Sequence, residues 1–243
     1  MLNLIPDPDV RDPRWMKLVE TSHQTSIFVL PEWLEHFRDK LAIAVVEDSA
    51  GRWRAAVVAQ RSSAPIPFFA YAGLLLTRRE DPAAVSLLLG WLEEEHPGAC
   101  VVNAPSLIDI RPFAWRSVKS GAIWTDRILY TFYTGRNTRP FPDMPVAESV
   151  PPPLLPGLGE LLGLDSVHMV SGVVWGVDKQ DRGYCIASSP GSEGVVWELA
   201  QRHPSADLFG ANSPAMNRRK RVYGAQLRTY YRMQHHERLE NGS

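Results

Sequence analysis

The chain has 243 residues, of which 44% are hydrophobic and 22% charged, a composition that excludes disordered, collagen-like and disulfide-knot proteins. Its 26 basic and 27 acidic residues give a net charge of -1, so no overall field favours DNA or a membrane as a partner. The 2 cysteines, Cys100 and Cys185, argue against a disulfide framework or a thiolate zinc site and favour a reducing cytoplasm. Residues 1–10 lack the basic and apolar regions of a signal peptide, and no apolar run reaches the roughly 20 residues that span a bilayer.

The first half predicts strands and helices in alternation. Proline after a capping residue marks helix starts, and β-rich runs around short polar turns mark hairpins. In chain order we expect a helix from Pro31, strands at 42–47 and 53–59 around the hairpin 48–51, a strand at 68–76, a helix from Asp81-Pro82 to His96, a strand at 99–103, a helix at about 107–118 and a long strand at 123–133.

The second half runs through a similar order. We expect strands at 167–177 and 184–188 around the turn 178–183, a helix from Ser189-Pro190 to about His203, a strand at 206–210, a basic helix from Ser213-Pro214 to Tyr223 and a last strand at 226–233. Both second helices carry a basic residue shortly before Gly-Ala, and an aromatic-rich strand follows each. We interpret the chain as a duplicated α/β unit.

A proline-dense segment separates the halves. Residues 139–156 contain Pro151-Pro152-Pro153 and suit neither a helix nor a central strand, so we expect a semi-rigid connector. The predicted domains are therefore 1–138, a linker at 139–156, and a shorter domain at 157–243.

With these elements laid out, the chain resembles the FemAB-like aminoacyltransferases, bacterial enzymes with two domains of the GNAT N-acetyltransferase fold. Ser26 through Pro31-Glu32-Trp33 resembles the family's S/Q-x-P-E-W helix start, and Tyr71-Ala72-Gly73-Leu74 resembles its Y-x-G-P-L strand. Residues 207–232 resemble its closing D-x-G-G, F-K-x-G-F-G-G and Y-Y pattern, although Arg219 replaces the aromatic residue of the F-K pair. The middle of the chain is shorter than in family members.

The resemblance implies an α/β (α+β) fold of two GNAT-like domains, each a mixed, mostly antiparallel sheet flanked by helices. It also implies an N-acyltransferase that moves an aminoacyl or acyl group to a small-molecule or peptide amine bound between the domains. We expect no tightly bound cofactor. The expected co-substrate is aminoacyl-tRNA, bound by its 3′ end, or acyl-CoA, and aminoacyl-tRNA is favoured.

The basic helix is the predicted site for the donor's phosphates. Arg219, Lys220, Arg221 and Tyr223 fall there, and the resemblance places Lys220 at the family's phosphate-facing lysine. A solvated helix face is an equal alternative, since a run of charges usually means only that.

Gly191 and Gly194 are a weaker candidate for binding the pyrophosphate of acyl-CoA at a helix start. Arg or Gln does not precede them, and Glu193 brings a negative charge to the loop. The glycines could instead only permit a tight turn, so aminoacyl-tRNA is the favoured donor.

Two further groups complete the candidate site. Asp207, Lys220 and Tyr71 are the catalytic candidates, because a carboxylate can take a proton from an amine and a tyrosine can hold a substrate. The alternative for Asp207 is an edge residue that bonds the nearby Ser213 turn. Asn103, Arg111 and Trp115 are the acceptor-binding candidates, although Asn and Ser near Pro also suit any turn.

Other classes of site receive little support. The histidines and carboxylates show no metal-ligand spacing, so we expect no metal, and we find no P-loop, G-x-S-x-G or G-x-G-x-x-G motif. Five tryptophans are expected in the core: Trp33, Trp91, Trp115, Trp175 and Trp197. The rival functions are a GNAT-like binding or scaffold module without catalysis and an acetyl-CoA-dependent N-acetyltransferase.

Overall fold

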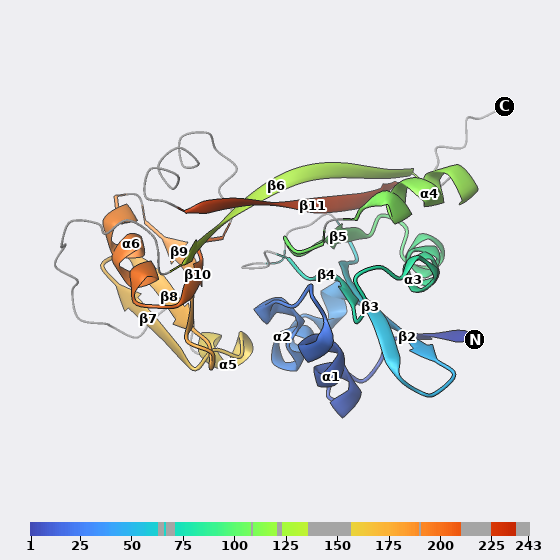
Figure 1. Cartoon of the computed structure of the whole chain (residues 1–243), viewed down its shortest axis with the longest axis horizontal. Helices are drawn as coiled ribbons and strands as arrows, with labels where there is room; N and C mark the ends of the chain where they lie inside the picture. Colours follow the sequence, from blue (N-terminus) through green and yellow to red (C-terminus); the bar gives the residue numbers. More distant parts are fainter. Residues whose placement is uncertain are drawn as a thin grey trace. The chain divides into compact units, whose positions relative to one another are not determined.

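The computed structural model describes residues 1–62, 66, 71–107, 109–120, 123–135, 157–189, 191–209 and 225–236. The chain divides into two compact units, and each is described by itself (Figure 1). Unit 1 comprises Met1–Ile128 and Tyr230–Ser243, and unit 2 comprises Leu129–Thr229. The predicted linker at 139–156 lies outside the described residues. The units do not follow the predicted boundary. The strands Ile123–Gly135 and Gln226–His236 each contribute residues to both units.

Unit 1 is a mixed α+β structure, as predicted. Its elements are β1 (Leu2–Pro6), α1 (Pro13–Thr21), the 3-10 turn η1 (Ile27–Val29), α2 (Pro31–His36), η2 (Arg38–Lys40), β2 (Leu41–Asp48), β3 (Trp53–Gln60), β4 (Gly73–Leu76), α3 (Pro82–Glu95), β5 (Cys100–Val102), α4 (Arg111–Ser120), the first part of β6 (Ile123–Gly135) and the last part of β11 (Gln226–His236). The strand order is β1-β2-β3-β5-β11-β6, and β4 pairs with β3. The helices at Pro31 and Pro82 begin where the sequence predicts.

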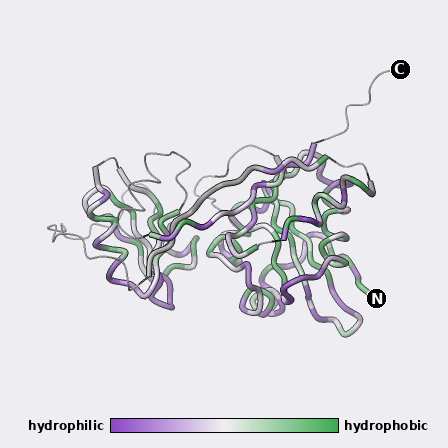
Figure 2. Tube along the Cα trace, turned by 45° about the horizontal axis from the view of Figure 1, so that its top comes forward, coloured by the Kyte–Doolittle hydropathy of each residue, from purple (hydrophilic) through white to green (hydrophobic). Residues whose placement is uncertain are grey.

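The sheet of unit 1 has hydrophobic residues on both faces. Ala42, Ala44 and Val46 of β2 pack with residues of β3, α3 and α4 in one core cluster. Because side chains alternate across a strand, Ile43 and Val45 lie on the other face, toward which α1 packs. Hydrophobic strand segments of this kind are green in Figure 2. Burial on two faces explains the nearly continuous apolar run of β2, which does not show the polar alternation of a half-exposed strand.

Unit 2 is built around an antiparallel meander that ends in one parallel pair. Its elements are the second part of β6, α5 (Leu158–Leu161), β7 (Ser166–Val170), β8 (Val173–Val177), β9 (Arg182–Ser188), α6 (Glu193–Gln201), β10 (Ser205–Asp207) and the first part of β11. β7, β8 and β9 are antiparallel neighbours, β10 is parallel to β9, and β10 is antiparallel to β6.

The prediction of one strand over residues 167–177 is wrong. The run is broken by a two-residue turn at Ser171-Gly172, whose φ angles are 44° and 82°. Such positive values at both central positions belong to the tight hairpin turn that fits the twist of the flanking strands. Glycine adopts this conformation readily and serine does not, so only one of the two turn residues is of a type that predicts such a turn.

Two of the predicted hairpin turns share one hydrogen-bonding scheme. Asp48 Oδ1 accepts from Ala50 N and Arg52 N, and its Oδ2 accepts from Arg52 Nε at 3.0 Å. Asp178 Oδ1 accepts likewise from the second and fourth residues after it, and its Oδ2 accepts from Arg182 Nε at 2.7 Å. The side-chain hydrogen bond from Arg52 is the main reason why the pKa of Asp48 falls to about 2. Burial would raise the pKa of Asp178, but hydrogen bonds from Arg182 and Tyr184 outweigh it, and the pKa is lowered.

The core of unit 2 packs around Trp175. Its ring stacks on His203 with centroids 5.9 Å apart, and Trp175 Nε1 donates to His203 Nε2 at 3.2 Å. A Cβ added to Gly183 would overlap the Trp175 ring and lie 2.9 Å from His203 Cδ2. Glycine at this position is therefore required by a close approach of two rings rather than by a turn.

Candidate functional site

Unit 2 contains a junction at which two parallel strands separate. β9 and β10 pair over Arg182–Tyr184 and Ser205–Asp207, and the pairing ends at Tyr184 and Asp207. β9 continues to Ser188, and its register with β8 shifts between Val174 and Trp175. A bulge of this kind bends a strand and changes the direction of its neighbours. Beyond the junction, one edge of β9 faces β8 and the other has no strand partner among the described residues.

The open edge of β9 leads directly to the start of a helix. Ser189 N donates to Gly172 O on the β8 side at 2.9 Å, and strand alternation then directs the Ser188 N–H to the opposite edge. Gly191 follows with φ of 87° and nothing within 4 Å of an added Cβ. The Ser192 hydroxyl donates to Ser189 O at 2.6 Å and does not cap α6. The first N–H groups of α6 therefore have no side-chain cap from Ser192, a feature that suits binding of an anion.

Asp207 lies at the point where β9 and β10 separate. It is buried, with 4% of its surface exposed, and its Oδ1 accepts from Phe209 N at 2.9 Å. Phe209 has a φ of 48°, so the chain turns away from β9 immediately after the strand. The alternative of an edge position is wrong, because β10 is paired on both sides; Ser213 lies outside the described residues. Asp207 is thus a buried carboxylate at the junction, and its predicted catalytic role is not tested.

Unit 1 has a corresponding junction that its own side chains fill. Ala72 and Asn103 form a parallel bridge between the ends of β4 and β5. On the β4 edge that faces away from β3, Leu74 N donates to Asn103 Oδ1 at 3.2 Å, and Leu76 N donates to Gln24 Oε1 at 3.0 Å and Ser22 Oγ at 3.1 Å. All three acceptor side chains are buried. The outward N–H groups of β4 are therefore occupied within the chain.

Gly73 brings Asn103 against the start of β4. Its φ is 65°, and an added Cβ would lie 2.6 Å from Asn103 Cα and 2.9 Å from Val102 O. Asn103 is fully buried, and its Nδ2 has no hydrogen-bond partner. Asn103 therefore has a structural role, because it holds the ends of β4 and β5 together. Its predicted role in acceptor binding is not tested.

Tyr71 belongs to the core of unit 1. Its ring lies 6.0 Å from that of Phe28 and 5.4 Å from that of Tyr230, and 3% of its surface is exposed. Tyr71 O accepts a hydrogen bond from Ser26 Oγ at 2.9 Å, so two segments of the sequence resemblance are in contact. Tyr71 and Asp207 belong to different units, and no single unit brings these two catalytic candidates together.

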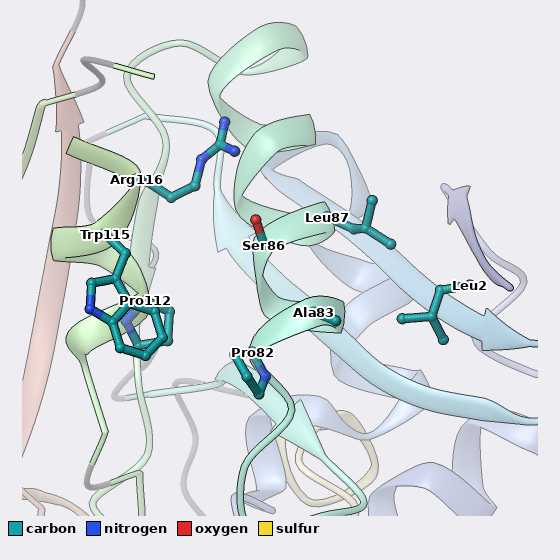
Figure 3. Close-up of a pocket in the computed structure, with 8 residues that line it drawn as sticks. All are labelled: Leu2, Pro82, Ala83, Ser86, Leu87, Pro112, Trp115 and Arg116. Carbon is teal, nitrogen blue, oxygen red and sulfur yellow. The ribbon is translucent and has the colours of Figure 1, made fainter. Parts of the chain in front are cut away.

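Trp115 lines a groove between α3 and α4 in unit 1, and Arg111 lines a smaller pocket beside it. The groove has a volume of about 590 Å³, and Figure 3 shows Pro112, Trp115 and Arg116 of α4 on one side of it and Pro82, Ala83, Ser86 and Leu87 of α3, with Leu2 of β1, on the other. The smaller pocket also includes Trp115. The Arg111 guanidinium lies 5.5 Å from the Trp115 ring and pairs with Asp109 at 2.8 Å. Trp115 is 43% exposed, so its prediction as a core residue is wrong.

A partly buried ion pair joins Glu93 to Arg116, which lines this groove. Glu93 accepts from Arg116 Nε at 2.9 Å and from Trp124 Nε1 at 2.9 Å, and a further hydrogen bond joins Arg116 Nη2 to Glu93. Burial alone would raise the pKa of Glu93, but these hydrogen bonds outweigh burial, and the pKa is lowered. The pair ties α3 to α4 and to the start of β6.

The remaining predicted residues divide into two groups. Arg219, Lys220, Arg221 and Tyr223 lie outside the described residues, so the proposed phosphate-binding helix is not tested. Gly194 is buried inside the first turn of α6, whereas Gly191 is exposed in the preceding loop. The helix begins at Glu193, three residues later than the Ser189-Pro190 sequence alone suggests. Ser22 and Gln24 were not predicted, because no spacing in the sequence connects them with β4.

The described residues offer neither a metal site nor a membrane-spanning helix. No group of three or more His, Cys, Asp or Glu side chains there could hold a metal ion. Within the same residues, no helix is long and apolar enough to cross a membrane.

Comparisons with known proteins give similarity to solved structures only. No protein-family model and no curated protein sequence matches the chain. Among solved structures, a GCN5-related N-acetyltransferase from Sphaerobacter thermophilus aligns over 96% of this chain and 95% of its own, with 11% sequence identity and a TM-score of 0.47. Similarity at this level does not establish a family, a substrate or an activity for this chain.

Proposed function

We propose that the protein is an N-acyltransferase whose activated acyl donor binds in unit 2, at the junction where β9 and β10 separate. Three observations on the described residues carry the proposal: β9 has no strand partner there beyond Tyr184 on its β10 side, Ser192 does not cap α6 beside Gly191, and the Asp207 carboxylate is buried. The sequence resemblance to FemAB-like aminoacyltransferases supports the same class of reaction.

Each part of the junction has a distinct task in this proposal. The N–H of Ser188 faces the open edge and is suited to hold the donor's acyl carbonyl. The start of α6 and the loop at Gly191 accommodate a phosphate group. Charge-assisted contacts from Arg219, Lys220 and Arg221 would add to this site, and they matter most for an aminoacyl-tRNA donor.

The reaction needs positioning and one proton acceptor. The amine nitrogen attacks the acyl carbon, a C–N bond forms, and the bond to the donor's sulfur or oxygen breaks. Asp207 accepts the amine proton, which then passes to the leaving thiolate or alkoxide. The hydrogen bond from Phe209 N to Asp207 Oδ1 orients the carboxylate for this role.

The closed junction in unit 1 makes unit 2 the preferred donor site. Asn103, Ser22 and Gln24 occupy the β4 N–H groups that a donor would need. Displacing them would leave buried polar groups without partners, at a cost of about 1–3 kcal/mol for each. Unit 1 is therefore assigned to acceptor binding through Arg111 and Trp115, or to a structural role.

Binding of the donor can be tested with two matched glycine variants. Gly191 and Gly157 both have positive φ, at 87° and 81°, and both have open space around an added Cβ. Val at either position therefore strains the backbone equally, but only Gly191→Val places a side chain at the α6 start. Titration with acetyl-CoA and with aminoacylated tRNA should show at least tenfold weaker donor binding for Gly191→Val and no change for Gly157→Val. Equal binding by both variants would contradict the assignment.

Catalysis can be tested separately from binding. Asp207→Asn keeps an oxygen for the Phe209 N–H but removes the base, so kcat should fall about 100-fold or more while donor Kd stays within twofold. If kcat is unchanged, Asp207 is not the base. If neither donor binds the wild-type protein, the rival interpretation as a non-catalytic module replaces the enzyme proposal.

A further inference from the structure

A strained residue lies two positions after Asp207, just beyond the end of β10. Phe209 has a φ of 48°, in the left-handed region that bulky side chains rarely adopt. Backbone strain of this kind persists only where neighbouring contacts hold it, and it is common at functional sites. The contacts of Phe209 therefore indicate which group the strained turn holds.

The backbone of Phe209 contacts the candidate base. Phe209 N donates to Asp207 Oδ1 at 2.9 Å, so the carboxylate bonds the backbone two residues further along the chain. Aspartate forms turns of this type readily. Because φ describes rotation about the bond between this nitrogen and Cα, the orientation of the N–H is coupled to the position of the Phe209 ring. The ring and the carboxylate therefore cannot move independently while the hydrogen bond is kept.

The ring of Phe209 packs on a residue of β9 that is itself held in place. The Phe209 and Tyr184 rings stack with their centroids 6.2 Å apart and their planes at 29°. Tyr184 is buried, and its hydroxyl donates to Asp178 Oδ2 at 2.9 Å. Asp178 is fixed in the turn between β8 and β9, where its Oδ1 accepts from Gln180 N and Arg182 N. Tyr184 therefore gives the Phe209 ring a well-ordered surface.

Tyr184 and Asp207 are also neighbours across the sheet. The two residues are partners in the register of β9 and β10, and partners on adjacent strands point to the same face. A continuous series of contacts thus runs from Asp178 through Tyr184 and Phe209 to the Asp207 carboxylate.

We propose that Phe209 is a positioning residue, whose ring, packed on Tyr184, holds the strained backbone that orients the Asp207 carboxylate for proton transfer. The inference rests on the proposed function, in which Asp207 is the base. Packing of the ring offsets the unfavourable φ, and the strained turn in turn keeps the N–H directed at Asp207 Oδ1. Phe209 acts through Asp207 and takes no part in the bonds that form or break.

Two substitutions separate the ring from the strain. Phe209→Ala removes the ring but keeps a Cβ, so a φ of 48° remains unfavourable and the turn should relax. Phe209→Gly also removes the ring, but glycine adopts positive φ freely and can keep the turn. The proposal therefore predicts that the Gly variant resembles wild type more closely than the Ala variant does. A ring that only filled space would give no such order, because glycine removes more of the side chain than alanine.

Amide hydrogen exchange at residue 209 measures the hydrogen bond without any need for activity. Followed by NMR and corrected for intrinsic rates, exchange should be about tenfold or more faster than wild type in Phe209→Ala and within about threefold of wild type in Phe209→Gly. Ser171→Ala is the matched control, because Ser171 has a similar φ of 44° between β7 and β8 and should leave residue 209 unchanged. Unchanged exchange in Phe209→Ala, or equally fast exchange in the Ala and Gly variants, would overturn the proposal.

Steady-state kinetics test the positioning role itself. In Phe209→Ala, kcat should fall about tenfold while the KM for the donor stays within about twofold, and Phe209→Gly should recover most of the lost kcat. A raised KM with unchanged kcat in Phe209→Ala would overturn the positioning role, because it would indicate a contact with bound substrate. A wild-type protein that transfers no acyl group would overturn the proposed function and the proton-transfer role with it. The order of exchange rates at residue 209 would still decide whether Phe209 holds the carboxylate.

Discussion

Asn103 closes the junction of unit 1, and its substitution should destabilise that unit. Its Oδ1 accepts from Leu74 N at 3.2 Å in a fully buried site. Asn103→Ala leaves this N–H without an acceptor, at a cost of about 1–3 kcal/mol. The substitution also removes Nδ2, which has no hydrogen-bond partner, and this offsets part of the destabilisation. The loss of side-chain packing increases the destabilisation. We expect the free energy of unfolding to fall by about 2 kcal/mol, or a Tm lower by about 4–8 °C.

A second substitution at the same position separates hydrogen bonding from volume. Asn103→Asp keeps an oxygen for Leu74 N–H but places a carboxylate where Nδ2 has no partner. Burial raises the pKa of such a carboxyl above its unfolded value, so the charge destabilises the fold above that value. At pH 7 the loss should exceed that of Asn103→Ala, and lowering the pH through the raised pKa should restore stability.

Urea denaturation followed by tryptophan fluorescence measures both effects. Ser106→Ala, an exposed change three residues away, is the control and should stay within about 0.5 kcal/mol of wild type. The reasoning fails if Asn103→Ala also stays within that range, or if the Asp variant is as stable at pH 7 as at pH 4.

Two other predictions concern stability. Glu93 has a lowered pKa, so its contribution is complete above its unfolded pKa of about 4.3 and is lost as the pH falls through the folded value. Glu93→Gln should therefore cost about 1–2 kcal/mol at pH 7, because the pair is only partly buried, and should reduce the acid dependence of Tm; an unchanged acid profile would show that the pair contributes nothing. Gly183→Ala should destabilise unit 2 by about 1–3 kcal/mol because its Cβ overlaps the Trp175 ring, while Gly159→Ala, whose Cβ meets Val167 at an ordinary 3.5 Å, should not. Equal Tm values for these two glycine variants would refute the packing argument.

Features that depend on neighbouring residues were predicted well. Asp81 caps α3 through Ala84 N, and Pro82 follows at the first helical position, so the start of this helix is explicit in the sequence. The turns at Asp48 and Asp178 are likewise local, because each carboxylate bonds residues within four positions. Burial of Trp33 and Trp175 follows from their apolar surroundings and was also predicted correctly.

Features that depend on distant residues were missed. Leu76 N is bonded by Gln24, which lies 52 residues earlier, and no periodic pattern connects the two. β1 and α1 were not predicted, because residues 2–6 become a strand only through pairing with β2. His235 is buried against Trp124, with ring centroids 5.2 Å apart, a contact that no sequence spacing indicates. Only these tertiary contacts show that the outward N–H groups of β4 are occupied by Asn103, Ser22 and Gln24.

Hydrogen–deuterium exchange with and without a donor tests the central claim most directly. The account places the donor at the open edge of β9 and the start of α6, and it leaves the β4 edge occupied by Asn103 and Gln24. Addition of saturating acetyl-CoA or aminoacylated tRNA should slow exchange in peptides covering 185–196 and leave peptides covering 72–77 unchanged. Protection at 72–77 without protection at 185–196 would contradict the assignment of the donor site to unit 2.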